Sequence, residues 1–363
     1  MTRPRPHHDR RTTLADVATR AGVSRATASR ALAGDERISA ATRAAVRDAA
    51  EALEYVPNMA ARSLRARHTK AFGLLLADLS DPVHGQVAAG FELAAAASGY
   101  TVIIVAAHGD PAAERRALTA FVERSTDGIC VASSAMDPVA IRDRLARTPV
   151  SIIQPDHDAL ITRASALPDG TIRTDDADGV RQAVRHLLSG GRRDVAYLGS
   201  GERATNRARR ATAEQTLLQA ADRRMRTFQV AEDAWTSPHA VADVVMSQLP
   251  EGIVCYDDKT ALALLDGLRS RGVQVPDDVA VVGFDDIPFA ALSNPRLTTV
   301  WTPTVEMGRL GASSLIGAVE TGELPAPRIL DVQIVVRESS GAATADASPP
   351  PSLPSRRAAI PGP

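Results

Sequence analysis

The sequence is poor in the residues on which several classes of protein depend. Its 363 residues include only 2 cysteines, and aromatic residues make up 3%. Cys130 and Cys255 lie far apart within apolar runs, so we expect two buried thiols rather than a disulfide framework or a zinc site. Because aromatic residues are scarce, Ala, Val, Leu and Ile must fill the core, which favours an aliphatic, helix-rich protein of two or three folding units.

Long apolar runs and catalytic motifs are also missing. No apolar run approaches the ~18 residues of a membrane span, and the basic N-terminal segment MTRPRPHHDRR has no apolar stretch behind it, unlike a secretory signal. The motifs GxSxG, GxxxxGKS/T and HExxH do not occur, nor does a Cys/His cluster with metal-ligand spacing. We therefore expect a cytoplasmic protein that is not an enzyme, with no membrane partner, no catalytic residues, no metal and no cofactor.

The charge of the chain is unevenly distributed. The formal net charge is only -1. Residues 1–70, however, contain fourteen Lys or Arg against seven Asp or Glu, so a head of net charge +7 precedes a body of about -8. Such an asymmetry is expected when one module meets nucleic-acid phosphates and the other does not.

Residues 12–55 show the spacing of three short helices. Apolar residues recur at helical spacing up to Ala18, and Gly22 then supplies a turn, because glycine readily adopts positive φ. Ser24 is placed to cap a second helix, and Ser39 a third. A short helix, a tight glycine turn and a second short helix form a helix-turn-helix, whose second helix lies in the major groove of DNA.

The outward face of the second helix carries the residues expected to meet base edges. These residues are Arg25, Ala26, Ser29 and Arg30. Arg30 is the first candidate for a guanine contact, because a guanidinium can bond O6 and N7 together. Hydroxyls near the helix N-termini are placed where phosphates would run, which positions the module without specifying sequence. They belong to Thr13, Ser24, Thr27, Ser39 and Thr42.

The segment TLADVATRAGVSRATASRAL, followed by EYVPNMAARSL, resembles the head of the lactose/galactose repressor (LacI–GalR) family. The likeness extends over residues 12 to about 340. It implies that the residues matching Arg25, Ala26 and Arg30 read bases. The phosphate-touching positions of the family correspond to Thr13, Ser24, Thr27, Ser39, Thr42, Tyr55 and Asn58. Leu14 and Ser29 complete the DNA-binding set that we predict.

Residues 57–65 link the head to the body and are too few to form a stable helix alone in water. The family resemblance implies that two such hinges fold side by side in the DNA minor groove. Leu64 would then wedge into the central base step, and Ala61 would allow close approach. A flexible linker is the alternative. We predict a homodimer on a pseudo-palindromic operator, because one head reads only a half-site.

From Ala71 onward, aliphatic runs alternate with amphipathic helical stretches. This rhythm predicts parallel sheets with helical crossovers, and the number of strands favours two subdomains. The expected fold class is an N-terminal all-α helix-turn-helix head plus an α/β body of two doubly wound parallel-sheet subdomains. The family resemblance implies that this body is periplasmic-binding-protein-like.

Five segments make up the predicted domain organisation. They are a disordered basic arm (1–11), the helix-turn-helix domain (12–56), the hinge and linker (57–70), a ligand-sensing body (71–340) and a disordered Pro-rich tail (341–363). Within the body we place the first subdomain at about 71–168 and 299–325, and the second at about 171–298 and 326–340. The two would meet near a turn at 168–174.

Polar residues directly after the aliphatic runs are candidates for a ligand site, because open parallel sheets bind ligands outside the carboxyl ends of their strands. The candidates on this ground are Asp78, Asp81, Gln154, Asp257, Asp258 and Asp285. The family resemblance implies that Arg209 and Asp285 are the sensing pair, which suits a polyhydroxylated or amide-bearing effector. Positions where relatives carry rings hold other residues here, so Trp235 or Trp301 is the expected stacking surface.

Together these features predict a sequence-specific DNA-binding transcriptional repressor. We expect it in the cytoplasm, associated with the nucleoid and controlled by a small polar metabolite such as a carbohydrate. Two alternatives stay open. One is the same regulator with a degenerate effector site, acting constitutively or through a protein partner. The other is a solute-binding protein that shares the body fold, which the helix-turn-helix opposes.

Overall fold

The structure is a computed structural model, and it describes residues 12–55, 68–134, 136–145, 147–156 and 167–341. The predicted arm at 1–11, most of the predicted hinge and linker, and nearly all of the predicted tail lie outside the described residues. The chain divides into two compact units, Met1–Thr69 and Lys70–Pro363, which we call the head and the body and describe separately.

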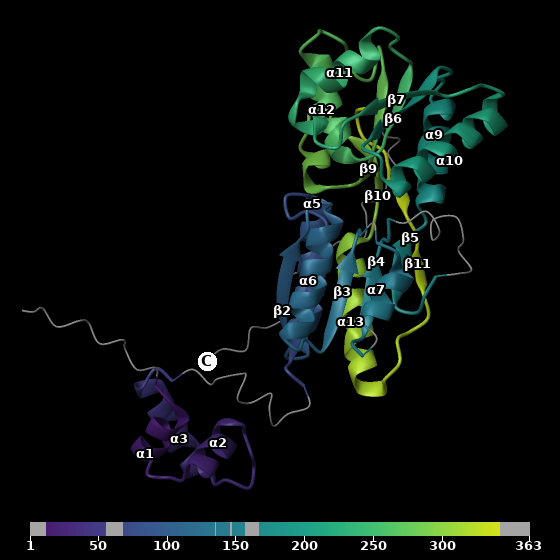
Figure 1. Cartoon of the computed structure of the whole chain (residues 1–363). Coiled ribbons are helices and arrows are strands. Elements are labelled where there is room, and N and C mark those ends of the chain that lie inside the picture. Colours follow the sequence, from purple (N-terminus) through teal and green to yellow (C-terminus); the bar gives the residue numbers. More distant parts are fainter. Residues whose placement is uncertain (1–11, 56–67, 135, 146, 157–166, 342–363) are drawn as a thin grey trace, which may run out of the picture. The chain divides into compact units, whose positions relative to one another are not determined.

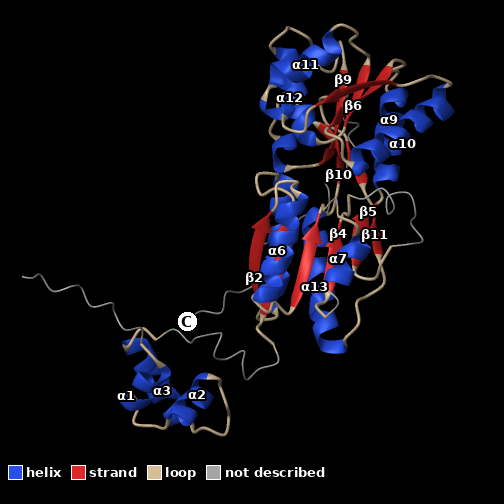
Figure 2. Cartoon of the chain, in the orientation of Figure 1, coloured by secondary structure: helices blue, strands red, loops and turns tan. Residues whose placement is uncertain are grey.

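The head is a bundle of three helices, as the sequence predicted (Figures 1 and 2). They are α1 (Leu14–Arg20), α2 (Arg25–Leu32) and α3 (Ala40–Ala52). Each helix begins directly after a hydroxyl residue whose side chain accepts a hydrogen bond from a backbone N–H of the first turn; these caps are Thr13, Ser24 and Ser39. Gly22 has φ +66° and makes the turn between α1 and α2. A small aliphatic core holds the three helices together.

The body has two lobes, each a six-stranded sheet with helices on both faces (Figure 2). The sheet of the first lobe has the order β11-β5-β4-β3-β1-β2 and is parallel throughout. Its strands are β1 (Ala71–Leu76), β2 (Thr101–Ala106), β3 (Gly128–Ala132), β4 (Val150–Ile153), β5 (Thr171–Thr174) and β11 (Arg328–Leu330). Its helices are α5 (Pro82–Ala97), α6 (Pro111–Glu123), α7 (Pro138–Arg144) and α13 (Thr304–Thr321).

The second lobe has the strand order β12-β10-β9-β8-β6-β7, parallel except for the pair β10 and β12. Its strands are β6 (Val195–Ser200), β7 (Arg226–Val230), β8 (Gly252–Cys255), β9 (Ala280–Asp285), β10 (Thr298–Trp301) and β12 (Gln333–Val335). Its helices are α9 (Asp176–Ser189), α10 (Ala204–Ala221), α11 (Pro238–Met246) and α12 (Asp258–Arg269), with short 3-10 turns at Ala234–Thr236 and Pro288–Ala291.

Successive side chains of the central strands point to opposite faces of the sheet and pack into the two cores of each lobe. In the first lobe, Leu74 and Leu76 pack with α5 and α13, whereas Leu75 between them packs with α6 and α7. Strands buried on both faces read as continuous aliphatic runs, which is why the sequence revealed these strands. Both cysteines lie in such strands and are free and buried, as expected.

The predicted boundary between the lobes was wrong in detail. The sequence predicts a turn and the start of the second lobe at residues 171–174, yet these residues form β5, which pairs with β4 and β11 in the first lobe. The segment TIRT lacks an aliphatic run, so only its backbone pairing identifies it as a strand. The predicted lobes are also wrong for residues 299–301 and 328–330, because β10 pairs with β9 in the second lobe and β11 with β5 in the first. Helix α13 and strand β12 lie in the lobes that were predicted for them. The chain therefore crosses between the lobes three times, after Thr174, Trp301 and Leu330.

Within the described ranges, no helix is long and apolar enough to cross a membrane. The same residues contain no group of three or more His, Cys, Asp or Glu side chains that could hold a metal ion.

Candidate functional site: head surface and interlobe cavity

The exposed face of α2 carries the predicted base-reading residues. Arg25, Ala26 and Arg30 are exposed, and Ser29 is half-buried. Ala28 and its neighbour Ala31 point instead into the head core. The side chains chosen for base recognition thus share one accessible helix face.

The N-termini of α2 and α3 are built alike. Ser24 Oγ accepts the Thr27 N–H at 3.1 Å and lies 2.9 Å from the Thr27 hydroxyl. The same arrangement joins Ser39 to Thr42, at 3.2 and 2.8 Å. Each N-terminus combines two hydroxyls with the positive end of a helix dipole, which favours an anion such as a phosphate.

The other predicted head contacts are placed less favourably. The Thr13 hydroxyl donates to Asp16 Oδ2 at 2.7 Å, so a carboxylate stands beside it and would repel a phosphate. Leu14 and Tyr55 are half-buried and pack partly against the head core. The predicted hinge contacts lie outside the described residues; they are Asn58, Ala61 and Leu64.

A cavity of about 370 Å³ lies between the two lobes of the body. This volume is at the lower end of the range of small-molecule sites, about 300–1,000 Å³. Most of its walls come from residues at or just after the carboxyl ends of strands in both lobes, as open parallel sheets require. Five of the seven predicted effector residues line it: Asp81, Gln154, Arg209, Asp257 and Asp285.

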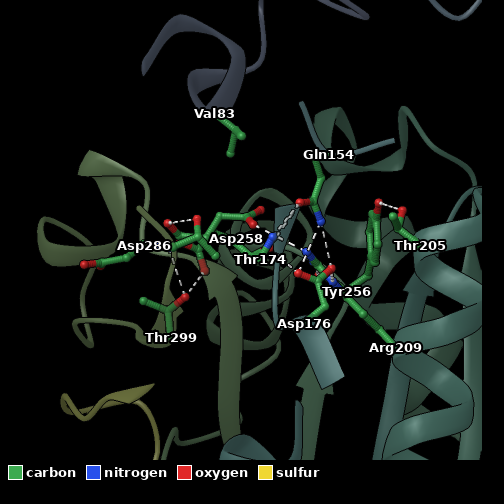
Figure 3. Close-up of polar contacts among 12 residues, drawn as sticks. Val83, Gln154, Thr174, Asp176, Thr205, Arg209, Tyr256, Asp258, Asp286 and Thr299 are labelled. Atoms are coloured by element: carbon green, nitrogen blue, oxygen red, sulfur yellow. Dashed lines mark hydrogen bonds and ion pairs between the residues drawn. The ribbon is translucent and has the colours of Figure 1, made fainter. Parts of the chain in front are cut away.

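Arg209 is the most heavily engaged side chain of the cavity (Figure 3). Its Nε donates to Asp176 Oδ2 and one terminal nitrogen donates to the Tyr256 carbonyl, both at 2.8 Å, while its guanidinium stacks 3.6 Å from the Phe284 ring centre. Burial works against the charge, but Asp176 and Asp285 hold the pKa of Arg209 above its ordinary value. The cation is therefore fixed in position before any ligand arrives.

Asp176 is one of the site residues that sequence reasoning missed. It opens α9, directly after β5, and accepts hydrogen bonds from Gln154 at 3.2 Å and from Thr174 at 2.5 Å (Figure 3). Gln154 belongs to the first lobe, so this network joins the lobes at the first crossing. The signal was hidden because β5 itself was not recognised as a strand.

Asp285 ends β9 at the cavity wall. Its φ is 108°, a value rare for residues other than glycine and found at functional sites where the surroundings enforce it. Burial raises the pKa of its carboxyl well above the usual range; Arg209, 3.8 Å away, opposes this rise, and Asp258 adds to it. The site therefore contains a carboxyl whose protonation responds to a nearby charge.

Two predicted effector residues do not reach the cavity. Asp258 is fully buried below it, where it accepts hydrogen bonds from Thr299 at 2.5 Å and from the Ile287 N–H at 2.9 Å. Its strand-end position thus serves the packing of α12 against the sheet. Trp301 pairs with Asp285 and Gln333 in the sheet and is not among the lining residues. Trp235, the other candidate ring, does line the cavity.

Two polar contacts tie the lobes across the cavity. Lys259 Nζ from α12 lies 2.6 Å from Asp81 Oδ2, which caps α5. Asp156 of the first lobe accepts hydrogen bonds from the backbone N–H and the hydroxyl of Thr205, at 2.8 and 3.0 Å. Sequence reasoning identified none of Lys259, Asp156 and Thr205, because each gains its role only from a partner on the other lobe.

A helix-turn-helix head joined to a two-lobed body with a polar interlobe cavity defines a class of DNA-binding regulator. Comparison with known proteins agrees with this class. Residues 13–58 match the family model "Bacterial regulatory proteins, lacI family", and residues 184–340 match the model "Periplasmic binding protein-like domain". The chain therefore combines a DNA-binding domain of the LacI family with a periplasmic-binding-protein-like domain, and it is a transcriptional regulator, not an enzyme.

Individual relatives are similar over nearly their whole length. The HTH-type transcriptional regulator DegA of Bacillus subtilis is 29% identical over 91% of this chain and 98% of its own. The solved lac repressor dimer, bound to operator and an anti-inducer, superposes with a TM-score of 0.81 at 22% identity, over 92% of this chain and all of that one. A CelR–cellobiose complex matches with a TM-score of 0.64 at 26% identity, over 91% and 100%.

Proposed function

We propose that this regulator is a repressor that binds a pseudo-palindromic operator as a homodimer and changes its grip when a small polar metabolite, such as a carbohydrate, enters the interlobe cavity. The observation that carries the proposal is the coexistence, in one chain, of an exposed α2 face bearing Arg30 and a cavity holding Arg209 and Asp285. The cellobiose held by the related CelR supports a carbohydrate effector.

The remaining sequence predictions belong to this proposal. Base reading falls to Arg25, Ala26, Ser29 and Arg30, and phosphate contact to the hydroxyls that flank the N-termini of α2 and α3. The hinge wedge at Leu64 and a location in the cytoplasm at the nucleoid stay predictions. A degenerate effector site is the less favoured candidate, because the cavity is open and its side chains are ordered by mutual hydrogen bonds.

Replacing Arg30 by Ala tests the DNA-reading half of the proposal. We expect the variant to lose about 1–3 kcal/mol of discrimination between its best operator and a version with the contacted guanine replaced, because the bidentate contact is gone. Operators would be found by genome-wide footprinting and affinities measured by fluorescence anisotropy at one fixed salt concentration.

Arg47→Ala is the matched control, since Arg47 is an exposed arginine on α3 that bonds a carbonyl of its own helix at 3.4 Å. It should leave discrimination unchanged. Equal weakening of Arg30→Ala on every DNA sequence would make Arg30 a phosphate contact instead of a base reader.

Sedimentation tests the proposed homodimer. Sedimentation of the full chain at micromolar concentration should give twice the 38.3 kDa of one chain, because two-fold symmetry is what matches two half-sites. A chain that sediments as a monomer, and binds a single half-site as tightly as a palindrome, would contradict the homodimer.

A further inference from the structure

The cavity carries an excess of negative charge. Of the described residues that line it, seven are carboxylates and only three are permanent cations. The cations are Arg203, Arg209 and Lys259. Low-dielectric walls strengthen the field of such an imbalance, so the charge of an entering molecule decides much of its binding energy.

Each of the three cations already has a carboxylate partner. Arg203 Nε lies 2.8 Å from Glu232, and Lys259 Nζ lies 2.6 Å from Asp81. Arg209 is neutralised from behind by Asp176, at 2.8 Å, and this carboxylate is not part of the cavity wall. A carboxylate or phosphate on a ligand would therefore have to break one of these pairs to gain a counter-charge.

Two of the acidic side chains, Asp257 and Asp285, lie at the carboxyl ends of neighbouring strands, and each can still pair with a cation. Asp257 follows β8, and its Oδ1 accepts only the Thr260 N–H at 2.8 Å among the hydrogen bonds described for it. Asp285 ends the adjacent β9, and its nearest cation is the already neutralised Arg209, at 3.8 Å. Both carboxylates line the cavity.

An ammonium group is already stabilised in this cavity, which is an independent observation. Lys259 keeps only 17% of its side chain exposed, and its Nζ lies 5.7 Å from the centre of the Trp235 ring. Burial alone would lower the pKa of Lys259, yet Asp81, Asp257 and Asp285 raise it. The surroundings that hold this ammonium would also favour one carried by a ligand.

We infer that the effector is a hydroxylated compound bearing an ammonium group, of the amino-sugar class, whose amine lies near Asp257 and Asp285, and that sugar acids and sugar phosphates are excluded. The inference rests on the proposed function, because it assumes that the cavity is the effector site. Gln154, Thr205 and Tyr256 offer polar groups to the hydroxyls of such a ligand, and Trp235 offers an apolar ring face.

Matched sets of probes test the inference on the full chain. Each set holds one pyranose ring as the amine, the neutral sugar and the acid: D-glucosamine, D-glucose and D-glucuronate, and the galactose and mannose equivalents. Isothermal titration calorimetry should show the amine of the preferred set binding at least tenfold more tightly than the neutral sugar, with no binding of the acid.

Proton release provides a second readout. Burial raises the pKa of Asp285, and a neighbouring ammonium would lower it again, so any proton that this carboxyl holds in the free protein would be driven off. Binding of the amine should therefore release protons, seen as a heat that changes with the ionisation enthalpy of the buffer. The neutral sugar should release none.

Asp257→Asn is the matching variant, because asparagine also caps a helix and so replaces only the charge. It should reduce the preference for the amine over the neutral sugar about tenfold. Asp266→Asn, on the same helix but half-exposed and paired with Arg269, should change neither.

The outcomes separate this inference from the proposed function. A neutral sugar or an acid that binds as tightly as its amine would overturn the inference and leave the effector site in place. If no probe of any set binds or stabilises the protein, the inference fails. The effector half of the proposed function fails only when a wider panel of polar metabolites also leaves the melting temperature unchanged.

Discussion

Replacing Arg209 by Leu is expected to destabilise the body by about 3–5 kcal/mol. The reason is that Asp176 would remain buried without its cation, which costs more than the lost contacts themselves. Arg209 and Asp176 expose only 8% and 15% of their side chains, so water cannot replace the missing partner. Urea unfolding followed by tryptophan fluorescence would measure the loss, because both tryptophans of the chain belong to the second lobe.

A second substitution tests whether the buried charge of Asp176 causes the loss of stability in Arg209→Leu. Adding Asp176→Asn to Arg209→Leu removes that charge and keeps an oxygen for the Thr174 hydroxyl, so the double variant should regain a substantial part of the stability. Arg210→Leu, at the next position of α10, is the control. Arg210 is 40% exposed and 3.8 Å from Glu214, and loss of such a surface pair should cost at most about 0.5 kcal/mol. A double variant no more stable than Arg209→Leu would refute the buried-charge explanation.

The second large effect is expected at Gly308, where α13 crosses α5. A Cβ at this position would fall well inside the van der Waals distance of the Val87 carbonyl oxygen, and a backbone atom cannot rotate away. Gly308→Ala should therefore force the helices apart and cost about 2–3 kcal/mol. Urea unfolding would measure this loss of the free energy of unfolding.

Gly317 offers a control in the same helix. A Cβ there meets nothing within 4 Å, so Gly317→Ala should stabilise the protein by about 0.5–1 kcal/mol through the better helix propensity of alanine. If Gly308→Ala stabilised the protein as Gly317→Ala is expected to do, helix propensity and not close packing would control this crossing.

The course of most elements could be predicted from the sequence because the signals were local. A few neighbouring residues are enough to predict the helix caps at Ser24 and Ser39, the glycine turn at Gly22 and the aliphatic strands. The strand β5 has no such signal: the segment Thr171–Thr174 is a strand only because β4 and β11 lie on either side of it. The lobes of β10 and β11 were predicted the wrong way round for the same reason: only long-range strand pairing decides them.

The residues of the candidate site also fall into those that local sequence signals predict and those that depend on long-range contacts. The strand-end rule placed Asp81, Gln154, Asp257 and Asp285 at one cavity, since it needs only the position of each residue after a strand. The same rule also selected Asp258, which follows β8 as Asp257 does. The Asp258 side chain, however, is buried and bonded to Thr299 instead of reaching the cavity. The partners Asp176 and Lys259 depend on the opposing lobe, and no periodicity of a single segment can show them.

The three crossings between the lobes also determine which lobe has all its helices and strands first while the chain is being synthesised. The second lobe receives all four of its helices before residue 270, and all strands except the short β12 by Trp301. The first lobe, although begun earlier, obtains α13 only at Thr304–Thr321 and β11 after that. Until then the sheet face that Leu74 and Leu76 share with α13 is only partly covered. A nascent chain thus carries an unfinished first lobe on the ribosome while the later lobe closes, the reverse of the usual N-terminal-first sequence.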